Sequence, residues 1–326
     1  MTLRNAMRGH GRLLAVLSAA GQLDPAAMPA ARLTPEAAAL FVRAMRAEGN
    51  ANSTIKVRLF DLHAAMKIMQ PEVDMGWLIR PSAHSLHVLL PIPHRRVELI
   101  GADVLYRWAI RLAGEALAMP PGPRCWVALR NAVILGLFAS RAPRLASMAA
   151  MRLGYNLERI GEGFGLTFGG GTLKTGATGR RLRYGVPPEL EPYMKEYLAN
   201  ARPALLNGGN SDHVWINELG RPLDACGIEV MVWRASGEEY DPARAFRPHH
   251  FRHELASSLA EKDPDNPGLA AAILGVSLAV AKRYYNHARQ VDAARRVVDH
   301  LEAEMERTKA FAQRLFEERP RILVGR

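Results

Sequence analysis

A chain of 326 residues is longer than one average domain and fits two. Hydrophobic residues make up 48% of it, which supports real cores, and only two cysteines exclude a disulfide framework and favour a reducing compartment. The net charge of +11 indicates a polyanionic partner such as a nucleic acid, with solubility alone as the competing explanation.

The first residues combine basic side chains with a short apolar run. Arg12 and Asp24 interrupt that run, so we interpret the segment as a helix and not as a signal peptide. No run approaches the ~20 apolar residues of a membrane span. We therefore expect a soluble, cytoplasmic protein that has no membrane partner.

Two helices are predicted next. Thr34 is placed to cap the first one, with Pro35 in its first turn, and Gly49 ends it. Ser53 or Thr54 is expected to cap the second helix, because apolar residues then recur at helical spacing. The N-terminal part is therefore predicted to be all helical.

A proline-rich stretch, 81–96, follows and shows little periodicity, so it is predicted to contain a linker between domains. Our boundaries are 1–85 for a helical N-terminal domain, 86–98 for the linker and 99–326 for a second domain.

The second domain begins with helical patterns, including an almost wholly apolar one over 125–140 that predicts a buried helix. Short β-type runs separated by glycines follow over 163–187 and predict a small antiparallel sheet. The segment 213–223 suggests one more short strand, and 224–318 is helical again. The predicted fold class is mainly α with a small antiparallel β-sheet (α+β).

The stretch "RPHHFRHELASSLA" places His249, His250, Arg252 and His253 at a helix start, since Pro248 cannot lie inside a helix. A helix N-terminus attracts anions, an arginine offers a fork to phosphate oxygens, and a histidine can move a proton near neutral pH. Two alternatives remain open for this cluster. One is a zinc site on the histidines, and the other is an ordinary solvated basic helix start.

The sequence downstream resembles the tyrosine recombinase (phage-integrase-like) family. The family pattern is H-x-x-R, then L-G-H or L-G-W, then a tyrosine nine residues later. This chain supplies H-x-x-R at 249–252 and L-G at 274–275, and it has Val276 in the place of the His or Trp. Tyr285 then stands at the nucleophile position, with Tyr284 as a packing neighbour.

The first half of the pattern matches more loosely. Arg144 stands at the family's first arginine, Ser147 replaces the family's glutamate, and Arg141 is a rival for the arginine position. Lys174 lies in the expected β-hairpin, as the family's lysine does. The resemblance covers roughly residues 98–300 by motif, and the N-terminal domain looks like the family's core-binding domain.

The resemblance implies a site-specific recombinase that cuts and rejoins DNA through a 3′-phosphotyrosyl intermediate, for integration, excision or transposition of a mobile element. It implies that Tyr285 attacks and that Arg144 and Arg252 clamp the phosphate in place of a metal. It also implies that Lys174 protonates the leaving oxygen, and that His249 accepts the tyrosine proton or bonds a phosphate oxygen. No cofactor and no metal are expected.

Val276 departs from the family because valine has no hydrogen-bond donor. Either activity is reduced, or His253, His250 or His287 supplies the donor; simple apolar packing of Val276 is the third explanation. An accessory DNA-binding protein with an impaired site and a type IB topoisomerase-like enzyme therefore remain alternative functions.

The expected partners are double-stranded DNA at a specific recombination site, a second to fourth copy of the chain on that DNA, and other recombinases. The C-terminal helix is expected to dock on a neighbouring copy or on its own domain. The basic residues expected to contact DNA are Lys56, Arg58, Arg95, Arg96, Arg180 and Arg181.

Overall fold

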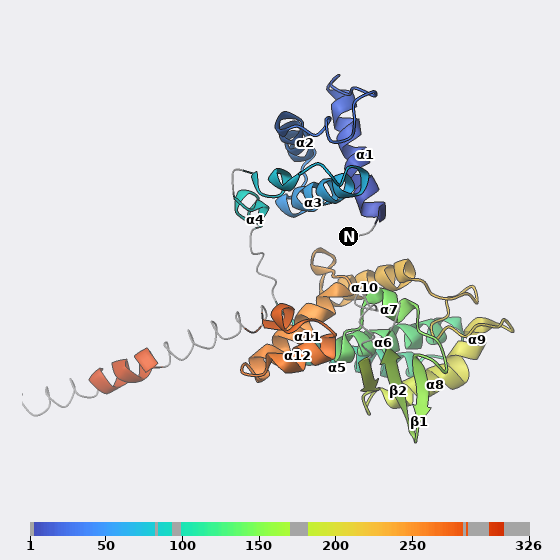
Figure 1. Cartoon of the computed structure of the whole chain (residues 1–326). Helices are drawn as coiled ribbons and strands as arrows, with labels where there is room; N and C mark the ends of the chain where they lie inside the picture. The colour runs from blue at the N-terminus through green and yellow to red at the C-terminus, as the bar shows by residue number, and fades with distance from the viewer. Residues whose placement is uncertain are drawn as a thin grey trace, which may run out of the picture. The chain divides into compact units, whose positions relative to one another are not determined.

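The computed structural model describes residues 3–81, 84–92, 99–169, 182–282, 285 and 300–309 (Figure 1). The chain divides into two compact units, Met1–Val97 and Glu98–Arg326. Among the helices within these described ranges, none is both long and apolar enough to cross a bilayer. The described elements are helices and one small antiparallel sheet, which confirms the predicted fold class.

The first unit is helical throughout its described part. Its elements are α1 (Leu3–Ala19), α2 (Pro35–Ala47), α3 (Asn52–Met69), the 3₁₀ turn η1 (Gly76–Leu78) and α4 (Leu86–Leu89). The Thr34 hydroxyl accepts a hydrogen bond from the Ala37 N–H at 3.2 Å, which confirms the predicted cap of α2. The predicted cap of α3 is wrong: α3 starts after Ala51, so Ser53 and Thr54 lie within its first turn.

The predicted linker begins too early. Leu86 and Leu90 are buried in the core of the first unit together with residues from α1, α2 and α3. The Asn52 side chain also donates to the Pro91 carbonyl at 2.9 Å. Residues 86–91 therefore belong to the N-terminal unit, because two leucines in this short segment bury apolar surface that a free linker would expose.

The second unit is a helical body with a three-stranded sheet. Its helices are α5 (Ala102–Ala118), α6 (Pro123–Arg141), α7 (Leu145–Ala149), α8 (Glu191–Glu196), the π-helical η5 (Tyr197–Ala201), α9 (Arg202–Leu206), α10 (Ala225–Tyr240), the 3₁₀ turn η6 (Pro242–Arg244), α11 (His249–Lys262) and α12 (Pro267–Leu274). Residues 278–282 and 300–309 are helical as well. The exposed leucine and methionine of this last segment are Leu301 and Met305.

The sheet has the order β1 (Leu157–Ile160), β2 (Gly163–Phe168) and β3 (Leu182–Gly185), with both pairs antiparallel. Leu157 and Leu166 face each other in its register and are buried with the apolar residues of α6. Helix α6 is buried along most of its length, as its uninterrupted apolar pattern predicted. The strand predicted over 213–223 is reduced to isolated bridges, Arg152 with His213 and Ile216 with Pro222.

Candidate active site

Helix α11 begins directly after Pro248 and carries H-x-x-R in its first turn. The Arg252 side chain is buried, with only 8% of the residue exposed. One of its terminal nitrogens donates to the Ala142 carbonyl, and the other donates to the Leu274 carbonyl at 2.6 Å. These bonds satisfy a buried guanidinium and hold Arg252 between the end of α6 and the end of α12.

Arg144 reaches the same place from another element. It is the residue before α7, and its Nη2 lies 3.4 Å from the Gly275 carbonyl. Leu274 and Gly275 are consecutive, so two arginines far apart in the sequence meet at the C-terminus of α12. A helix C-terminus carries partial negative charge, which favours cations there. The structure thus brings together the two arginines that the sequence predicted as a phosphate clamp.

A cavity of about 10 Å³ lies where these elements meet, which is room for roughly one water molecule. Both Arg144 and Arg252 line it, together with the buried Ser147 and with Tyr184 of β3. The Tyr184 hydroxyl donates to the Ile273 carbonyl, so β3 is tied to α12 beside the cavity.

Arg141, the rival first arginine, holds a different part of the fold. Its Nε and Nη2 donate to the Gly185 carbonyl at 3.1 and 2.9 Å. Burial lowers the pKa of its guanidinium. Arg141 therefore secures the end of β3, although it also lines the cavity. Of the two candidates, Arg144 is the one that meets Arg252 at α12.

The turn after α12 explains the L-G part of the motif. Gly275 has φ +59°, and a Cβ there would come within 2.4 Å of the Leu182 Cδ1 atom. The positive φ favours glycine, whereas the close contact is with the tip of a leucine side chain, which can shift. Val276 follows, is partly buried, and packs against the apolar cluster that contains Tyr285.

Tyr285 lies in this cluster with only 1% of the residue exposed. The cluster also contains Ala142 and Leu274, whose carbonyls accept from Arg252. Burial raises the pKa of the Tyr285 phenol, so the ring is neutral at neutral pH. Attack on a phosphate therefore requires this ring to leave its apolar surroundings.

Two histidines of α11, His249 and His253, contact each other, whereas His250 contacts other residues. The His249 and His253 rings touch edge to face, with centroids 4.8 Å apart. Burial lowers the pKa of both, and the positive charge of Arg252 adds to the effect on His249. Both imidazoles are therefore neutral at neutral pH and can accept a proton. Within the described ranges, no group of three or more His, Cys, Asp or Glu side chains is arranged to hold a metal.

His250 contacts Glu254 and Phe246. Its Nε2 lies 2.7 Å from the Oε1 atom of Glu254, and its ring contacts the Phe246 ring in a tilted arrangement with centroids 4.5 Å apart. His250 is therefore committed to a buried pair inside the protein. Glu254 was not among the residues predicted from the sequence, although its spacing of four residues from His250 on one helix predicts such a pair.

The two predicted DNA contacts of the N-terminal unit, Lys56 and Arg58, differ in exposure. Lys56 is 5% exposed, and its ammonium lies 3.2 Å from the His87 Nδ1 atom. Arg58 donates to the buried Asp61 at 2.8 Å. Lys56 is itself buried and contacts the exposed His87, whereas the Arg58 side chain is 30% exposed and pairs with the buried Asp61. The structure therefore does not present Lys56 as a surface phosphate contact.

Several predicted residues lie outside the described residues. They are Arg95, Arg96, Lys174, Arg180, Arg181, Tyr284 and His287.

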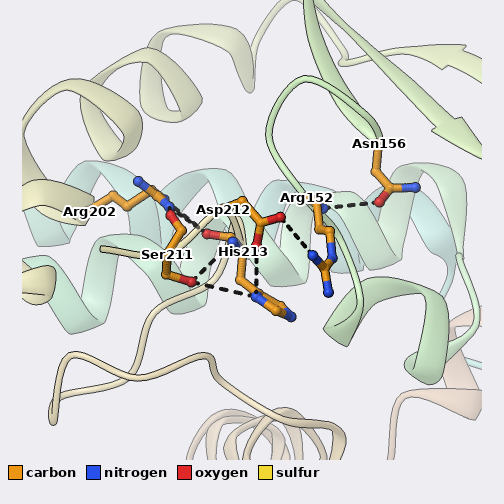
Figure 2. Close-up of polar contacts among 6 residues, drawn as sticks. All are labelled: Arg152, Asn156, Arg202, Ser211, Asp212 and His213. Carbon is orange, nitrogen blue, oxygen red and sulfur yellow. Dashed lines mark hydrogen bonds and ion pairs between the residues drawn. The ribbon is translucent and has the colours of Figure 1, made fainter. Parts of the chain in front are cut away.

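Another polar cluster lies between α9 and β1 (Figure 2). Arg152 pairs with Asp212 at 2.7 Å, and Arg202 donates to the carbonyls of Ser211 and His213. The Ser211 hydroxyl and the Asp212 carboxylate both face Nδ1 of His213, at 3.5 and 3.4 Å. A hydrolytic triad needs the two ring nitrogens to face different partners. The cluster therefore fastens the 211–213 segment to the body and offers no nucleophile.

No family model matches the chain. Two similar curated proteins are the tyrosine recombinase XerC of Lactobacillus leichmannii and the tyrosine recombinase XerD of Halalkalibacterium halodurans. The first is 29% identical over 139 residues, which are 42% of this chain and 43% of XerC. The second is 29% identical over 152 residues, which are 46% of this chain and 47% of XerD. The matched part thus spans less than half the length of these relatives.

Solved structures agree over more of the chain. The integrase of the Tn1549 transposon, in complex with transposon right end DNA, gives a TM-score of 0.59 at 16% identity and covers 89% of this chain and 93% of its own. The XerH site-specific recombinase bound to difH substrate gives a TM-score of 0.55 at 17% identity and covers 81% of this chain and 70% of its own. At such identity these two structures establish the fold alone.

Proposed function

Because this chain belongs to the tyrosine recombinase family, we propose that it cuts and rejoins DNA through a covalent bond between Tyr285 and a DNA 3′-phosphate. The tyrosine oxygen forms a bond to phosphorus, and the bond from phosphorus to the 5′-oxygen breaks and releases a 5′-hydroxyl. Attack of a 5′-hydroxyl on the phosphotyrosine reverses the step. The number of phosphodiester-type bonds is conserved, so no external energy source is needed.

The single observation that carries the proposal is the meeting of Arg144 and Arg252 at the end of α12. Two guanidiniums from different elements can bind both non-bridging oxygens of one phosphate. The transition state of phosphoryl transfer adds negative charge on these oxygens, so fixed cations stabilise it more than the ground state. We assign this role to the two arginines.

The remaining roles follow from the chemistry of the side chains. His249 is neutral at neutral pH and accepts the Tyr285 proton or donates a hydrogen bond to the phosphate. Lys174 protonates the leaving 5′-oxygen. The substrate is double-stranded DNA at a specific site, and the chain acts on it as a dimer to tetramer, alone or beside other recombinases, in the cytoplasm. The biological role is integration, excision or transposition of a mobile element, an assignment favoured by the fold shared with the Tn1549 integrase.

One observation favours a second candidate, an accessory DNA-binding protein. Val276 has no donor where the family pattern has His or Trp, and Ser147 stands where it has Glu. A relaxing enzyme of the type IB topoisomerase kind would share the chemistry and act as a single copy, so the oligomeric state on DNA separates it from a recombinase.

Trapping of the covalent intermediate tests the proposal. Binding sites are first selected from random duplex DNA, and the selected duplexes are then nicked so that the released fragment diffuses away after cleavage. We expect a denaturation-resistant protein–DNA adduct with the parent chain. Tyr285→Phe should abolish the adduct and leave DNA binding nearly intact, since only the phenol oxygen is removed. An adduct that persists in Tyr285→Phe and disappears in Tyr284→Phe would move the nucleophile by one residue.

A further inference from the structure

Helix α5 begins without a cap of its own. Its N-cap residue is Gly101, which has φ +99° and no side chain to accept a hydrogen bond. The first N–H groups of a helix have no partner within the helix, and leaving them buried and unpaired is costly. The start of α5 therefore depends on acceptors from elsewhere in the fold.

Those acceptors come from α11, the helix that carries His249 and Arg252. The Glu254 carboxylate accepts from the Ile100 N–H at 3.0 Å and from the Gly101 N–H at 2.8 Å. The Ser258 hydroxyl, one turn later, accepts from the Ala102 N–H at 3.0 Å. Three consecutive amides at the start of α5 are thus bound by two side chains on one face of α11.

The Glu254 carboxylate is 1% exposed and is held as an anion. Burial alone would raise the pKa of this carboxyl, but the hydrogen bonds from His250, Ile100 and Gly101 outweigh burial and lower it. The partial positive charge of the α5 N-terminus favours the same ionised state. Removal of the carboxylate would leave His250 and two amides without their acceptor.

The placement matters because α11 is fixed on two sides. Arg252 ties it to Ala142 and Leu274, and two residues further on Glu254 ties it to the start of α5. We propose that Glu254 is a positioning residue for the reaction: it fixes α11 against the first turn of α5 and thereby sets where His249 and Arg252 lie. This inference rests on the proposed DNA cleavage.

The test compares Glu254→Gln with Glu261→Gln in the full chain. The control makes the same chemical change at an exposed position of the same helix. Melting temperature, DNA affinity and the single-turnover rate of adduct formation at saturating protein are measured well below the melting temperature. We expect Glu254→Gln to slow adduct formation by about tenfold to 10²-fold, since small misplacements of reacting groups cost this much, and to change DNA affinity by less than about twofold.

Two further variants keep the test decisive if Glu254→Gln folds poorly. Glu254→Asp retains the charge on a shorter side chain and should restore part of the rate of adduct formation. Ser258→Ala should lower this rate by a smaller factor than Glu254→Gln does, again with little change in DNA affinity. In Glu254→Gln, hydrogen exchange of the backbone amides should be faster than in the parent chain both at residues 99–104 and at residues 249–256. Exchange that quickens only at 99–104, with an unchanged adduct rate, would overturn the proposal and leave Glu254 as a cap of α5.

If the parent chain forms no adduct, the proposed function is refuted. The coupling between the start of α5 and α11 is not refuted by this result, because amide exchange measures it without any cleavage. Exchange at 249–256 that stays at the parent rate in Glu254→Gln would refute the coupling even if the parent cleaves.

Discussion

Two pairs of basic residues, one in each unit of the chain, have different kinds of partners. In the C-terminal unit, Arg144 and Arg252 extend from different elements to adjacent carbonyls at one helix end. In the N-terminal unit, Lys56 and Arg58 stand on the same helix and are occupied by His87 and Asp61. We therefore expect substitution of Arg144 or Arg252 to impair the proposed chemistry, and substitution of Lys56 to affect mainly stability.

The largest expected effect is at Arg252. Arg252→Ala should reduce adduct formation by about 10³-fold or more, because it removes half of the proposed clamp. It should also lower the free energy of unfolding by about 2–4 kcal/mol, since the carbonyls of Ala142 and Leu274 lose their donors. Single-turnover cleavage and thermal melting measure the two effects.

Arg144→Ala should affect cleavage but, unlike Arg252→Ala, hardly affect stability. The hydrogen bond from Arg144 to the Gly275 carbonyl is 3.4 Å long and contributes little to folding, so we expect the melting temperature to change only slightly. Cleavage should still fall by about 10²–10³-fold, while DNA affinity falls much less. Equal losses of cleavage and affinity would instead indicate ordinary phosphate anchoring.

Substitution of Lys56 in the N-terminal unit should lower stability and leave the rate of cleavage unchanged. Lys56→Ala should lower the free energy of unfolding by about 1–3 kcal/mol, because it removes a buried stem and the bond to His87. Adduct formation at saturating protein should stay at the parent rate. Lys67→Ala, at an exposed site on the same helix, is the control and should change stability by less than about 0.5 kcal/mol. If Lys56→Ala weakens DNA binding and leaves the melting temperature unchanged, Lys56 is a phosphate contact after all.

Lowering the pH should have a smaller effect, on the stability of the chain. The pKa values of His249 and His253 are lowered by burial, so between those values and the ordinary pKa the folded chain binds fewer protons than the unfolded chain. Stability should therefore fall as the pH drops below about 6.5. His10 and His63 in the N-terminal unit have lowered pKa values too and contribute with the same sign.

The measurement is the melting temperature of the full chain between pH 5 and 7.5. The double variant with His249→Gln and His253→Gln should lose less stability on acidification than the parent does. Identical curves for the two proteins would mean that these histidines titrate alike in the folded and unfolded chains.

The smallest change is expected at Val276. Val276→His adds a donor beside the proposed clamp and should speed cleavage by about tenfold, a part of what one such donor contributes. The new imidazole is partly buried and costs about 1–3 kcal/mol of stability. If cleavage does not gain, and His253→Ala is then strongly impaired in the parent, His253 already supplies the missing donor.

Local chemistry explains what the sequence could predict. The cap at Thr34 and the buried helix α6 follow from hydrogen bonding and from the apolar pattern. The order of the family's motifs along the chain also led us to predict Arg144 and Arg252 as a phosphate clamp, and this role stays a prediction. These features depend on a few neighbouring residues.

Tertiary contacts explain what the sequence could not predict. Lys56 is buried because α4 brings His87 to it, and no local pattern specifies that approach. Glu254 looked like one charged residue on an amphipathic helix, and its role depends on amides 153 and 154 residues away. The first residues of the expected linker were misassigned for the same reason, since Leu86 and Leu90 are buried by helices distant in sequence.

The most direct test of the central claim is whether Arg144 and Arg252 neutralise charge on one phosphate. Adduct formation is compared on DNA with a normal scissile phosphate and on DNA with a neutral methylphosphonate at that position. On normal DNA we expect both Arg→Ala variants to be strongly impaired, and on the neutral substrate each should approach the parent rate. Impairment by the same factor on both substrates would contradict the account, because the arginines would then act on something other than the charge of the reacting phosphate.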